Sequence, residues 1–305
     1  MHKNMTQLFS DCLPTESILA TEETLRPYEC DALTAYKTLP MAVLLPATEQ
    51  QVVAIIKRCY QEQIPIVTRG AGTGLSGGAN PISQGIVLNL AKLNTIYEIN
   101  PQQQYARVGP GVRNLAISEA ASQYGLYYAP DPSSQIACTI GGNIAENSGG
   151  VHSLKYGTTT NNVLGIEIVL MDGTILRVGG KHLDSEGYDL LGIFIGSEGL
   201  LGVVTEATVK IWKKPEAVRA VLIGFNSIED AGSCVSDVIS KGIVPAGMEI
   251  MDKPLIIATD NYAKAGYPRD VEALLIVELD GTTSEVDTKI FCFLHFNWII
   301  WIKHN

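Results

Sequence analysis

One short loop near the start of the chain carries five glycines and gives the strongest sign of chemistry in the sequence. Residues 64–78 read IPIVTRGAGTGLSGG, so an apolar run ends in a loop with a single cation, Arg69. Glycine lacks a Cβ atom, so its backbone can lie against a ligand, and successive N–H groups can form an anion-binding nest. We interpret the loop as a diphosphate cradle. The alternative is a flexible glycine loop without a ligand.

The same loop matches the dinucleotide-binding pattern GxGxxG through Gly72, Gly74 and Gly77. An acidic residue, Glu98, lies about twenty residues further on, as that pattern requires. The pattern must also open a helix, but here a turn leads directly into another β-prone run, residues 86–90. The sequence therefore predicts that phosphates are held by loop backbone between two strands.

Two further glycine-rich segments follow. Residues 127–157 read YYAPDPSSQIACTIGGNIAENSGGVHSLKYG, and residues 139–143 predict the entry to a short helix whose free N–H groups would suit a phosphate. Residues 196–202, GSEGLLG, run into a predicted strand. The alternative for the second segment is a solvated loop. Three glycine loops at strand ends are the pattern that a long, bent dinucleotide needs.

Hydrophobic periodicity predicts the elements that position these loops. Thr48 and Gln51 form a capping box before a helix with one apolar face, and Asn114 is predicted to cap a second helix that ends at Gly125. Beyond Pro215 the pattern restarts as a further α+β segment, with a helix capped by Ser227. The predicted strands are 41–45, 64–68, 86–90, 96–99, 105–108, 165–170, 174–178, 203–212, 220–225, 248–251 and 273–279.

Composition narrows the functional class. The chain has 305 residues and a net charge of −10, which argues against non-specific nucleic-acid binding and against a polybasic membrane contact. Its six cysteines form no CxxC pair and no metal-binding spacing, which favours free thiols in a reducing compartment. We find no secretory signal, no membrane span and no metal site. We expect a cytoplasmic protein, or one held at the inner membrane by partner subunits.

Three stretches together carry a family resemblance: VTRGAGTGLSGG, APDPSSQIACTIGGNIAENSGGVHSLKYG and GSEGLLGVVTE. They resemble the PCMH-type FAD-binding domain of the vanillyl-alcohol-oxidase superfamily, and within it the FAD-linked subunits of glycolate oxidase and the related D-lactate dehydrogenases. The resemblance runs from about Pro27 to about Asp287. It implies an α+β fold in which two α+β subdomains hold FAD. Because Thr73 stands where histidyl-linked members have histidine, we expect noncovalent FAD.

The resemblance also implies a domain plan and a set of site residues. We predict a helical, polar lead-in (1–38), the FAD-binding domain (39–216), an incomplete substrate or cap domain (217–287) and an aberrant hydrophobic tail (288–305). His152 is the candidate catalytic residue, and a structural, hydrogen-bonded histidine is the alternative. The predicted cofactor-binding residues are Arg69, Gly70, Ala71, Gly72, Thr73, Gly74, Ser76, Gly77, Pro130, Asp131, Ser134, Ile140, Gly141, Gly142, Asn143, Glu146, Asn147, Gly149, Gly150, Tyr156, Gly157, Glu198, Gly202 and Val203.

The activity that the resemblance implies is oxidation of a D-2-hydroxy acid, glycolate or D-lactate, to the 2-oxo acid with hydride transfer to flavin N5. Electrons would then pass to a quinone or to partner subunits, including an iron–sulfur subunit. Family members continue beyond this length with a histidine-rich metal site and substrate-orienting residues, whereas residues 288–305 read TKIFCFLHFNWIIWIKHN. We therefore expect a truncated chain that binds FAD and turns over hydroxy acids poorly, and an exposed hydrophobic contact is the alternative for the tail.

Two other functions are compatible with the sequence. The chain could be a non-catalytic flavin-binding subunit or scaffold that a partner completes. It could also be a flavin-dependent reductase that uses NAD(P)H on the same fold.

Overall fold

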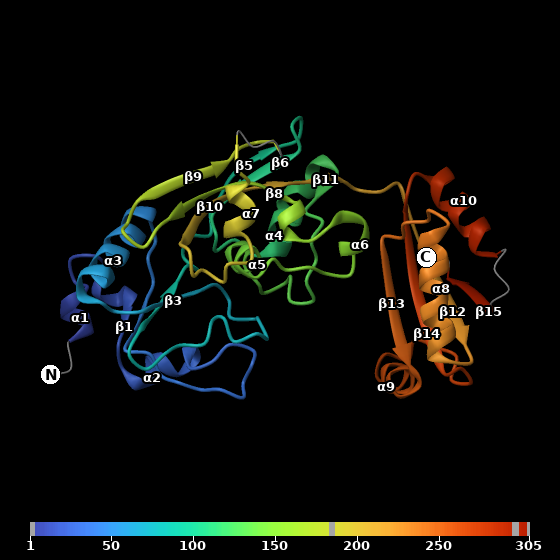
Figure 1. The fold of residues 1–305 in the computed structure, drawn as a ribbon, viewed down its shortest axis with the longest axis horizontal. Helices are drawn as coiled ribbons and strands as arrows, with labels where there is room; N and C mark the ends of the chain where they lie inside the picture. The colour runs from blue at the N-terminus through green and yellow to red at the C-terminus, as the bar shows by residue number, and fades with distance from the viewer. Residues whose placement is uncertain (1–3, 183–186, 295–298, 304–305) are drawn as a thin grey trace. The chain divides into compact units, whose positions relative to one another are not determined.

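The computed structural model describes residues 4–182, 187–294 and 299–303, and the chain divides into two compact units (Figure 1). The first unit comprises residues 1–148 and 158–212, and the second comprises residues 149–157 and 213–305. The predicted α+β class is confirmed, because helices and several separate sheets alternate along the chain. The second unit begins at Lys213, two residues before the predicted boundary at Pro215, and also takes in residues 149–157.

A four-stranded sheet begins the first unit, in the order β1-β2-β4-β3. β2 and β3 both run parallel to β4, while β1 is antiparallel to β2. The helix after β2 begins where the sequence predicts, because the Thr48 hydroxyl accepts a hydrogen bond from the Gln51 N–H at 3.2 Å. These elements are β1 (Ile18–Leu19), β2 (Ala42–Leu44), α3 (Glu49–Glu62), β3 (Ile66–Arg69) and β4 (Ile86–Asn89).

A five-stranded antiparallel sheet, in the order β5-β6-β10-β8-β9, forms the second layer of this unit. Apolar side chains on one of its faces pack with two helices into a core that contains Ile117, Ile140 and Ile144. The helices are α4 (Asn114–Ala121) and α5 (Ile140–Glu146), and the strands are β5 (Ile96–Asn100), β6 (Tyr105–Val108), β8 (Val163–Val169), β9 (Ile175–Gly179) and β10 (Val203–Lys210).

One local prediction in the first unit is wrong. Asn114 is the first residue of α4 rather than its cap, because its side chain donates to the buried Pro130 carbonyl at 3.0 Å. The segment predicted as a helical, polar lead-in contains four short helical elements and β1, and its Phe9 is fully buried in the core of the first sheet. The sequence does not predict this burial, because the apolar residues of the segment are isolated and lack helical spacing. The short elements are α1 (Met5–Leu8), η1 (Thr15–Ser17), α2 (Glu22–Leu25) and η2 (Arg26–Tyr28).

The second unit is built on a four-stranded antiparallel sheet in the order β13-β14-β12-β15. Two helices, α8 and α10, cover one face and share a core with alternate residues of β12 and β14. Ser227 caps α8 as the sequence predicts, accepting from the Asp230 N–H. The elements are β12 (Ala217–Phe225), α8 (Ile228–Ser240), β13 (Gly247–Asp252), α9 (Lys253–Ala263), β14 (Ala273–Gly281), α10 (Thr283–Leu294) and β15 (Ile299–Lys303).

The segment predicted as an aberrant tail takes part in this sheet. Residues 288–294 complete α10, and β15 pairs antiparallel with β12 (Figure 1). Residues 295–298 and 304–305 of that segment lie outside the described residues. The remaining short elements of the chain are η3 (Ser122–Tyr124), β7 (Leu126–Tyr127), α6 (Ser153–Tyr156), η4 (Thr159–Asn161), α7 (Leu190–Phe194) and β11 (Trp212–Lys213).

Candidate functional site

The first glycine loop presents unused backbone donors. Among the described residues, no backbone N–H from Gly70 to Ala79 donates a hydrogen bond to another group of the chain. Gly72 and Gly77 have φ angles of +71° and +83°, a left-handed conformation that glycine adopts without strain. A run of unpaired N–H groups in such a loop is the donor set that an anion needs. The loop can therefore hold a diphosphate through its backbone.

Arg69, the one cation predicted at this loop, packs its guanidinium against the loop backbone. The guanidinium donates to the Cys30 carbonyl at 2.7 Å and to the Ala79 carbonyl at 3.4 Å, and it lies over the ring of Tyr28. Arg69 is only 7% exposed. Burial lowers the pKa of Arg69 from its usual range. A Cβ atom at Gly72 would lie only 2.2 Å from a guanidinium nitrogen of Arg69, so Arg69 occupies the space that a side chain at Gly72 would need. Arg69 thus supports the loop from behind.

The first loop packs directly on α5, which belongs to the second glycine segment. A Cβ atom on Gly70 would lie 2.1 Å from Oγ1 of Thr139, the cap of α5. The Ser76 hydroxyl donates to the Glu146 carboxylate at 2.9 Å. The structure therefore brings together the two segments that the sequence paired, although 70 positions separate Ser76 from Glu146.

The N-terminus of α5 does not offer the free donors that the sequence predicted. The N–H groups of Ile140 and Gly141 donate to the carbonyls of Val112 and Pro110, each at 2.8 Å. The third, on Gly142, points to the Thr139 hydroxyl at 3.4 Å. Phosphate binding at the start of α5 is therefore not supported, because carbonyl groups of residues 110 and 112 already accept hydrogen bonds from these N–H groups. The unused donors lie in the first loop instead.

The third glycine loop is fixed to the C-terminal end of α5. Gly196 and Glu198 donate their N–H groups to the carbonyls of Ile144 and Ala145, both at 2.9 Å. A Cβ atom on Gly199 would lie 3.2 Å from Thr68, at the start of the first loop. All three glycine loops therefore meet around α5, as a dinucleotide site requires.

Several other predicted residues shape the backbone of this site. Asn147, with φ of +52°, accepts from the Thr158 hydroxyl and from the Thr160 N–H with its side-chain oxygen. A Cβ atom on Gly141 would lie 2.7 Å from Pro110. The structure places the following predicted residues in the first unit, on the three loops or beside them: Gly70, Ala71, Gly72, Thr73, Gly74, Ser76, Gly77, Pro130, Asp131, Ser134, Ile140, Gly141, Gly142, Asn143, Glu146, Asn147, Glu198, Gly202 and Val203.

Three buried side-chain atoms of the first unit make no hydrogen bond of ordinary geometry among the described residues. They are Nδ2 of Asn143, a residue 2% exposed on α5, Oδ2 of Asp31, a residue 5% exposed, and the hydroxyl of Tyr128. Asn143 lies beside the Cys138 thiol and Tyr128 beside Thr159. Such atoms are costly unless a ligand or water satisfies them. Asp31 was missed by the sequence reasoning, although the adjacent Ala32 N–H donates to the Gly74 carbonyl of the first loop. Asp31 becomes a candidate site residue only through its burial in the structure.

The second unit contains the remaining predicted residues: Gly149, Gly150, His152, Tyr156 and Gly157. Nε2 of His152 lies 2.9 Å from Oε1 of Glu278 on β14, and its ring lies edge-on to that of Tyr156. A paired histidine is what the structural alternative expects. A catalytic role for His152 stays a prediction.

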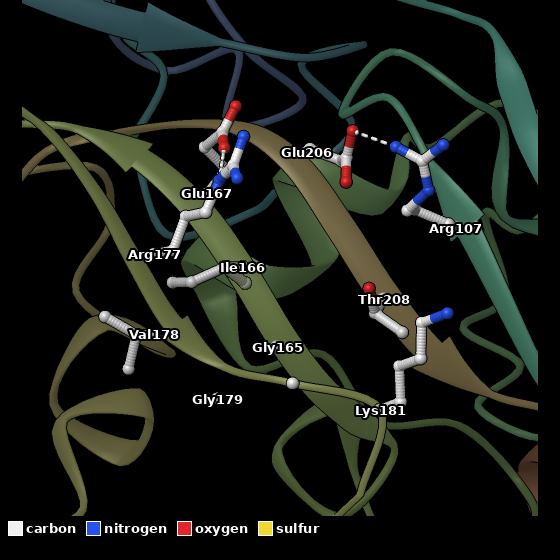
Figure 2. A pocket seen from close by; sticks show the side chains of 11 residues that line it. Arg107, Gly165, Ile166, Glu167, Arg177, Val178, Gly179, Lys181, Glu206 and Thr208 are labelled. Carbon is white, nitrogen blue, oxygen red and sulfur yellow. Dashed lines mark hydrogen bonds and ion pairs between the residues drawn. The ribbon is translucent and has the colours of Figure 1, made fainter.

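A separate hollow of about 310 Å³ lies on the other face of the five-stranded sheet and shares no residue with the glycine loops (Figure 2). Its charges are largely paired across strands: Arg107 donates to Glu206 at 2.8 Å, and Arg177 donates to Glu167. Cross-strand pairs of opposite charge are typical of a solvated sheet face. We therefore assign no ligand to this hollow.

Glu49, at the first turn of α3, reaches this face and interacts with Glu167. Burial and the neighbouring Glu167 raise the pKa of Glu49. The hydrogen bond between the two carboxyl groups lowers the pKa of Glu167. Thr205 donates to Glu49 at 2.7 Å, and Arg177 offsets part of the charge. The two carboxyl groups therefore favour sharing one proton.

Replacing Glu49 with glutamine should make the first unit less sensitive to pH. A raised carboxyl pKa contributes stability while the group is protonated, and this contribution is lost as the pH rises through the raised value. Glutamine stays neutral, so we expect a higher thermal midpoint than wild type at about pH 8 and a smaller fall between about pH 5 and 8. The exposed Glu119→Gln on α4 is the control. A lower midpoint for Glu49→Gln at both pH values would contradict the shared proton.

Comparison with known families agrees with this geometry. Residues 40–179 match the family described as FAD binding domain, and residues 214–291 match FAD linked oxidases, C-terminal domain. The chain is 55% identical over 274 residues to glycolate oxidase subunit GlcD of Escherichia coli K12, which covers 90% of this chain and 55% of the relative. It is 42% identical over 241 residues to D-lactate dehydrogenase of Archaeoglobus fulgidus, which covers 78% of this chain and 54% of the relative. The chain thus spans about half the length of the curated relatives it matches.

Solved structures share the fold. An alkyldihydroxyacetonephosphate synthase superposes with a TM-score of 0.82 at 18% identity, covering 98% of this chain and 60% of that one. A p-cresol methylhydroxylase superposes with a TM-score of 0.82 at 21% identity, covering 98% of this chain and 65% of that one. These likenesses support the predicted architecture and carry no statement about substrate.

The protein belongs to the FAD linked oxidases, and FAD is its cofactor. The residues present fit that cofactor, since the first loop supplies unused N–H donors and Asn143 an unsatisfied amide. Within the described part of the chain, no helix is long and apolar enough to cross a membrane. The same residues contain no group of three or more side chains placed to hold a metal ion.

Proposed function

We propose that this chain is part of an FAD-dependent dehydrogenase that oxidises a small D-2-hydroxy acid, glycolate or D-lactate, to the 2-oxo acid. The observation that supports it best is the convergence of three glycine loops around α5, with unused N–H donors on the first loop. The substrate class rests on the names of the relatives, glycolate oxidase subunit GlcD and D-lactate dehydrogenase.

The residues of the first unit would bind and orient the cofactor. The N–H groups of residues 70–79 would hold the diphosphate, and Nδ2 of Asn143 would donate to the cofactor. Because the Thr73 side chain cannot form the histidyl link, the cofactor would be noncovalent. FAD, when bound, supplies the hydride acceptor for the oxidation of the hydroxy acid.

Partner subunits form part of this proposal, because one relative is named as a subunit of glycolate oxidase. We propose that the electrons pass to such a partner, with an iron–sulfur subunit as the expected type. A location in the cytoplasm, or at the inner membrane through that partner, is the corresponding proposal for the cell.

An absorption spectrum of the purified chain, recorded without oxygen, tests the activity. Bands near ~375 and ~450 nm report bound oxidised flavin. Bleaching by glycolate or D-lactate, with L-lactate as the control, is the expected result for a dehydrogenase with this substrate class. Bands that persist with every hydroxy acid would instead support a non-catalytic flavin-binding subunit. Bleaching by NADPH alone would support a reductase.

A further inference from the structure

Residues 28–33, which we call the strap, run from the last residue of η2 into an irregular stretch of chain. The segment that matches the FAD binding domain begins only at residue 40, so the strap lies before it. The strap and the first glycine loop (70–79) nevertheless belong to the same unit. Cys30 and Arg69 are 39 positions apart, so contacts between the two segments form only when the chain folds.

One side chain, Arg69, joins the strap to both ends of the first loop. Arg69 directly precedes the loop, and its guanidinium donates to the Cys30 carbonyl of the strap at 2.7 Å. The same nitrogen lies 3.4 Å from the carbonyl oxygen of Ala79, the last residue of the loop. The guanidinium also lies 5.6 Å from the centre of the Tyr28 ring, close enough for a cation to be attracted to an aromatic face. Arg69 therefore fastens the start and the end of the loop to the strap.

Two backbone N–H groups of the strap bind the loop and the residue that follows it. The Ala32 N–H donates to the carbonyl of Gly74, in the middle of the loop, at 3.2 Å. The Asp31 N–H donates to the side-chain oxygen of Asn80 at 2.7 Å. Because both donors belong to the main chain, these bonds fix the path of the strap backbone along the loop.

The strap uses the acceptors of the loop and leaves its donors unused. The loop groups that it engages are the carbonyl oxygens of Gly74 and Ala79. The N–H groups of residues 70–79 donate to no other group among the described residues. An anion binds N–H groups and is repelled by carbonyl oxygens. The strap therefore holds the loop by the groups that an anion does not need.

Arg69 and Asp31 also place two opposite charges in the interior, at 7% and 5% exposure. Burial lowers the pKa of Arg69, and the nearby negative charge of Asp31 opposes this shift. One carboxylate oxygen of Asp31 accepts from the Leu33 N–H at 2.8 Å, and the other makes no hydrogen bond among the described residues. The carboxylate thus shapes the strap and helps to keep the buried guanidinium charged.

We propose that the strap is a positioning segment of the cofactor site: through Arg69 and Asn80 it holds the first glycine loop in the conformation whose N–H groups bind the diphosphate of FAD. The inference rests on the proposed assignment of that loop to the diphosphate. A loop that is already ordered binds its ligand more tightly, because less conformational entropy is lost on binding. The cofactor site therefore extends to residues that precede the matched domain.

Two variants separate the strap from the loop at different points. Arg69→Met removes the guanidinium that reaches the Cys30 carbonyl and keeps an apolar side chain in its place. Asn80→Ala removes the acceptor of the Asp31 N–H. Asn80 is only partly buried, so this second variant should fold even if the first does not.

The first unit offers a matched control for each variant. Arg58→Met removes a guanidinium that donates to a distant backbone carbonyl, that of Leu8. Asn100→Ala removes a side-chain oxygen that accepts a backbone N–H, from Gln103 at 2.9 Å. Each control loses the same kind of hydrogen bond as its partner variant, away from the strap and the glycine loops.

The measurements are the FAD dissociation constant from flavin fluorescence, the thermal midpoint of the apoprotein, and amide hydrogen exchange of residues 28–33 and 70–79. We expect FAD to bind about tenfold more weakly to Arg69→Met and about three- to tenfold more weakly to Asn80→Ala, since bonds to a charged group are the stronger ones. The amides of residues 31–33 should exchange faster in both. At saturating FAD the absorption bands should equal those of wild type, because the strap acts through the loop.

The controls show whether the effect is specific. Arg58→Met and Asn100→Ala are expected to lower the thermal midpoint and to leave both the FAD affinity and the exchange of residues 31–33 unchanged. A loss of FAD affinity in the controls as large as in Arg69→Met and Asn80→Ala would trace the effect to general stability, and would overturn the proposal.

Hydrogen exchange with FAD separates this inference from the cofactor assignment on which it rests. In wild type, FAD is expected to protect the amides of residues 70–79. If it does so while Arg69→Met and Asn80→Ala bind FAD as tightly as wild type, the assignment stands and the strap is only a structural support. If FAD binds to wild type and protects none of these amides, the assignment of the first loop fails, and the inference fails with it.

Discussion

Replacing Gly70 with alanine is expected to weaken FAD binding by at least tenfold and to lower the free energy of unfolding by about 1–2 kcal/mol. The new methyl group would lie 2.1 Å from Oγ1 of Thr139, so either the first loop or that hydroxyl must move. If the hydroxyl rotates away, α5 loses its cap. If the loop moves, the unused N–H donors of the cradle move with it. Either response disturbs the contact between the first and second glycine segments.

A second substitution tests that explanation for Gly70. Thr139→Ala removes Oγ1, the atom with which the new methyl group would clash, and it also removes the cap of α5. The double variant should therefore be no less stable than Thr139→Ala, and it should recover part of the FAD affinity. Gly180→Ala, where a Cβ atom meets nothing within 4 Å, is the control in the same unit. Equal FAD affinity of wild type and Gly70→Ala in a fluorescence titration would show that the contact does not matter for the cofactor.

Replacing Asn143 with leucine is expected to separate stability from cofactor binding. Nδ2 of Asn143 is buried without a partner among the described residues, so an apolar side chain of similar shape should leave the stability of the apoprotein unchanged or raise it by about 1 kcal/mol. FAD should bind about tenfold or more weakly, because the donor proposed for it is gone. Thermal unfolding with and without FAD, together with a titration, measures both effects.

The chain offers a matched control in Asn114, a second buried asparagine, on the neighbouring helix. Its amide donates to the buried Pro130 carbonyl at 3.0 Å, so Asn114→Leu leaves that carbonyl unsatisfied. We expect it to cost about 1–3 kcal/mol of stability in the apoprotein. A loss of that size for Asn143→Leu, without a change in FAD affinity, would mean that Asn143 has a structural partner and no cofactor role.

Local signals in the sequence predicted most of the elements. The caps predicted at Thr48 and Ser227 lie where the structure has them, because a cap joins atoms only three residues apart. Asn114 was predicted as a cap and is not one, since a carbonyl 16 residues away takes its side chain. The polar pattern at a helix start is therefore reliable only where no distant group competes for the same side chain.

The sequence predicted which loops form the candidate site, but it did not predict what each residue of those loops contacts. Glycine spacing identified the three loops, since the absence of a side chain is visible in the sequence. It could not show that Arg69 turns towards Cys30, nor that the first N–H groups of α5 are already used by Val112 and Pro110. Asp31 gave no signal because a lone carboxylate in an irregular segment usually lies in solvent.

The sequence by itself indicated the class of the protein through its family resemblance. It also located the glycine loops and the succession of strands and helices, because glycine spacing, capping and periodicity act over a few residues. Only the tertiary structure decided which backbone donors remain unused, and that residues 149–157 contact β14. The reason is physical: such contacts join groups far apart in the chain, 126 positions for His152 and Glu278, and are formed only when the chain packs.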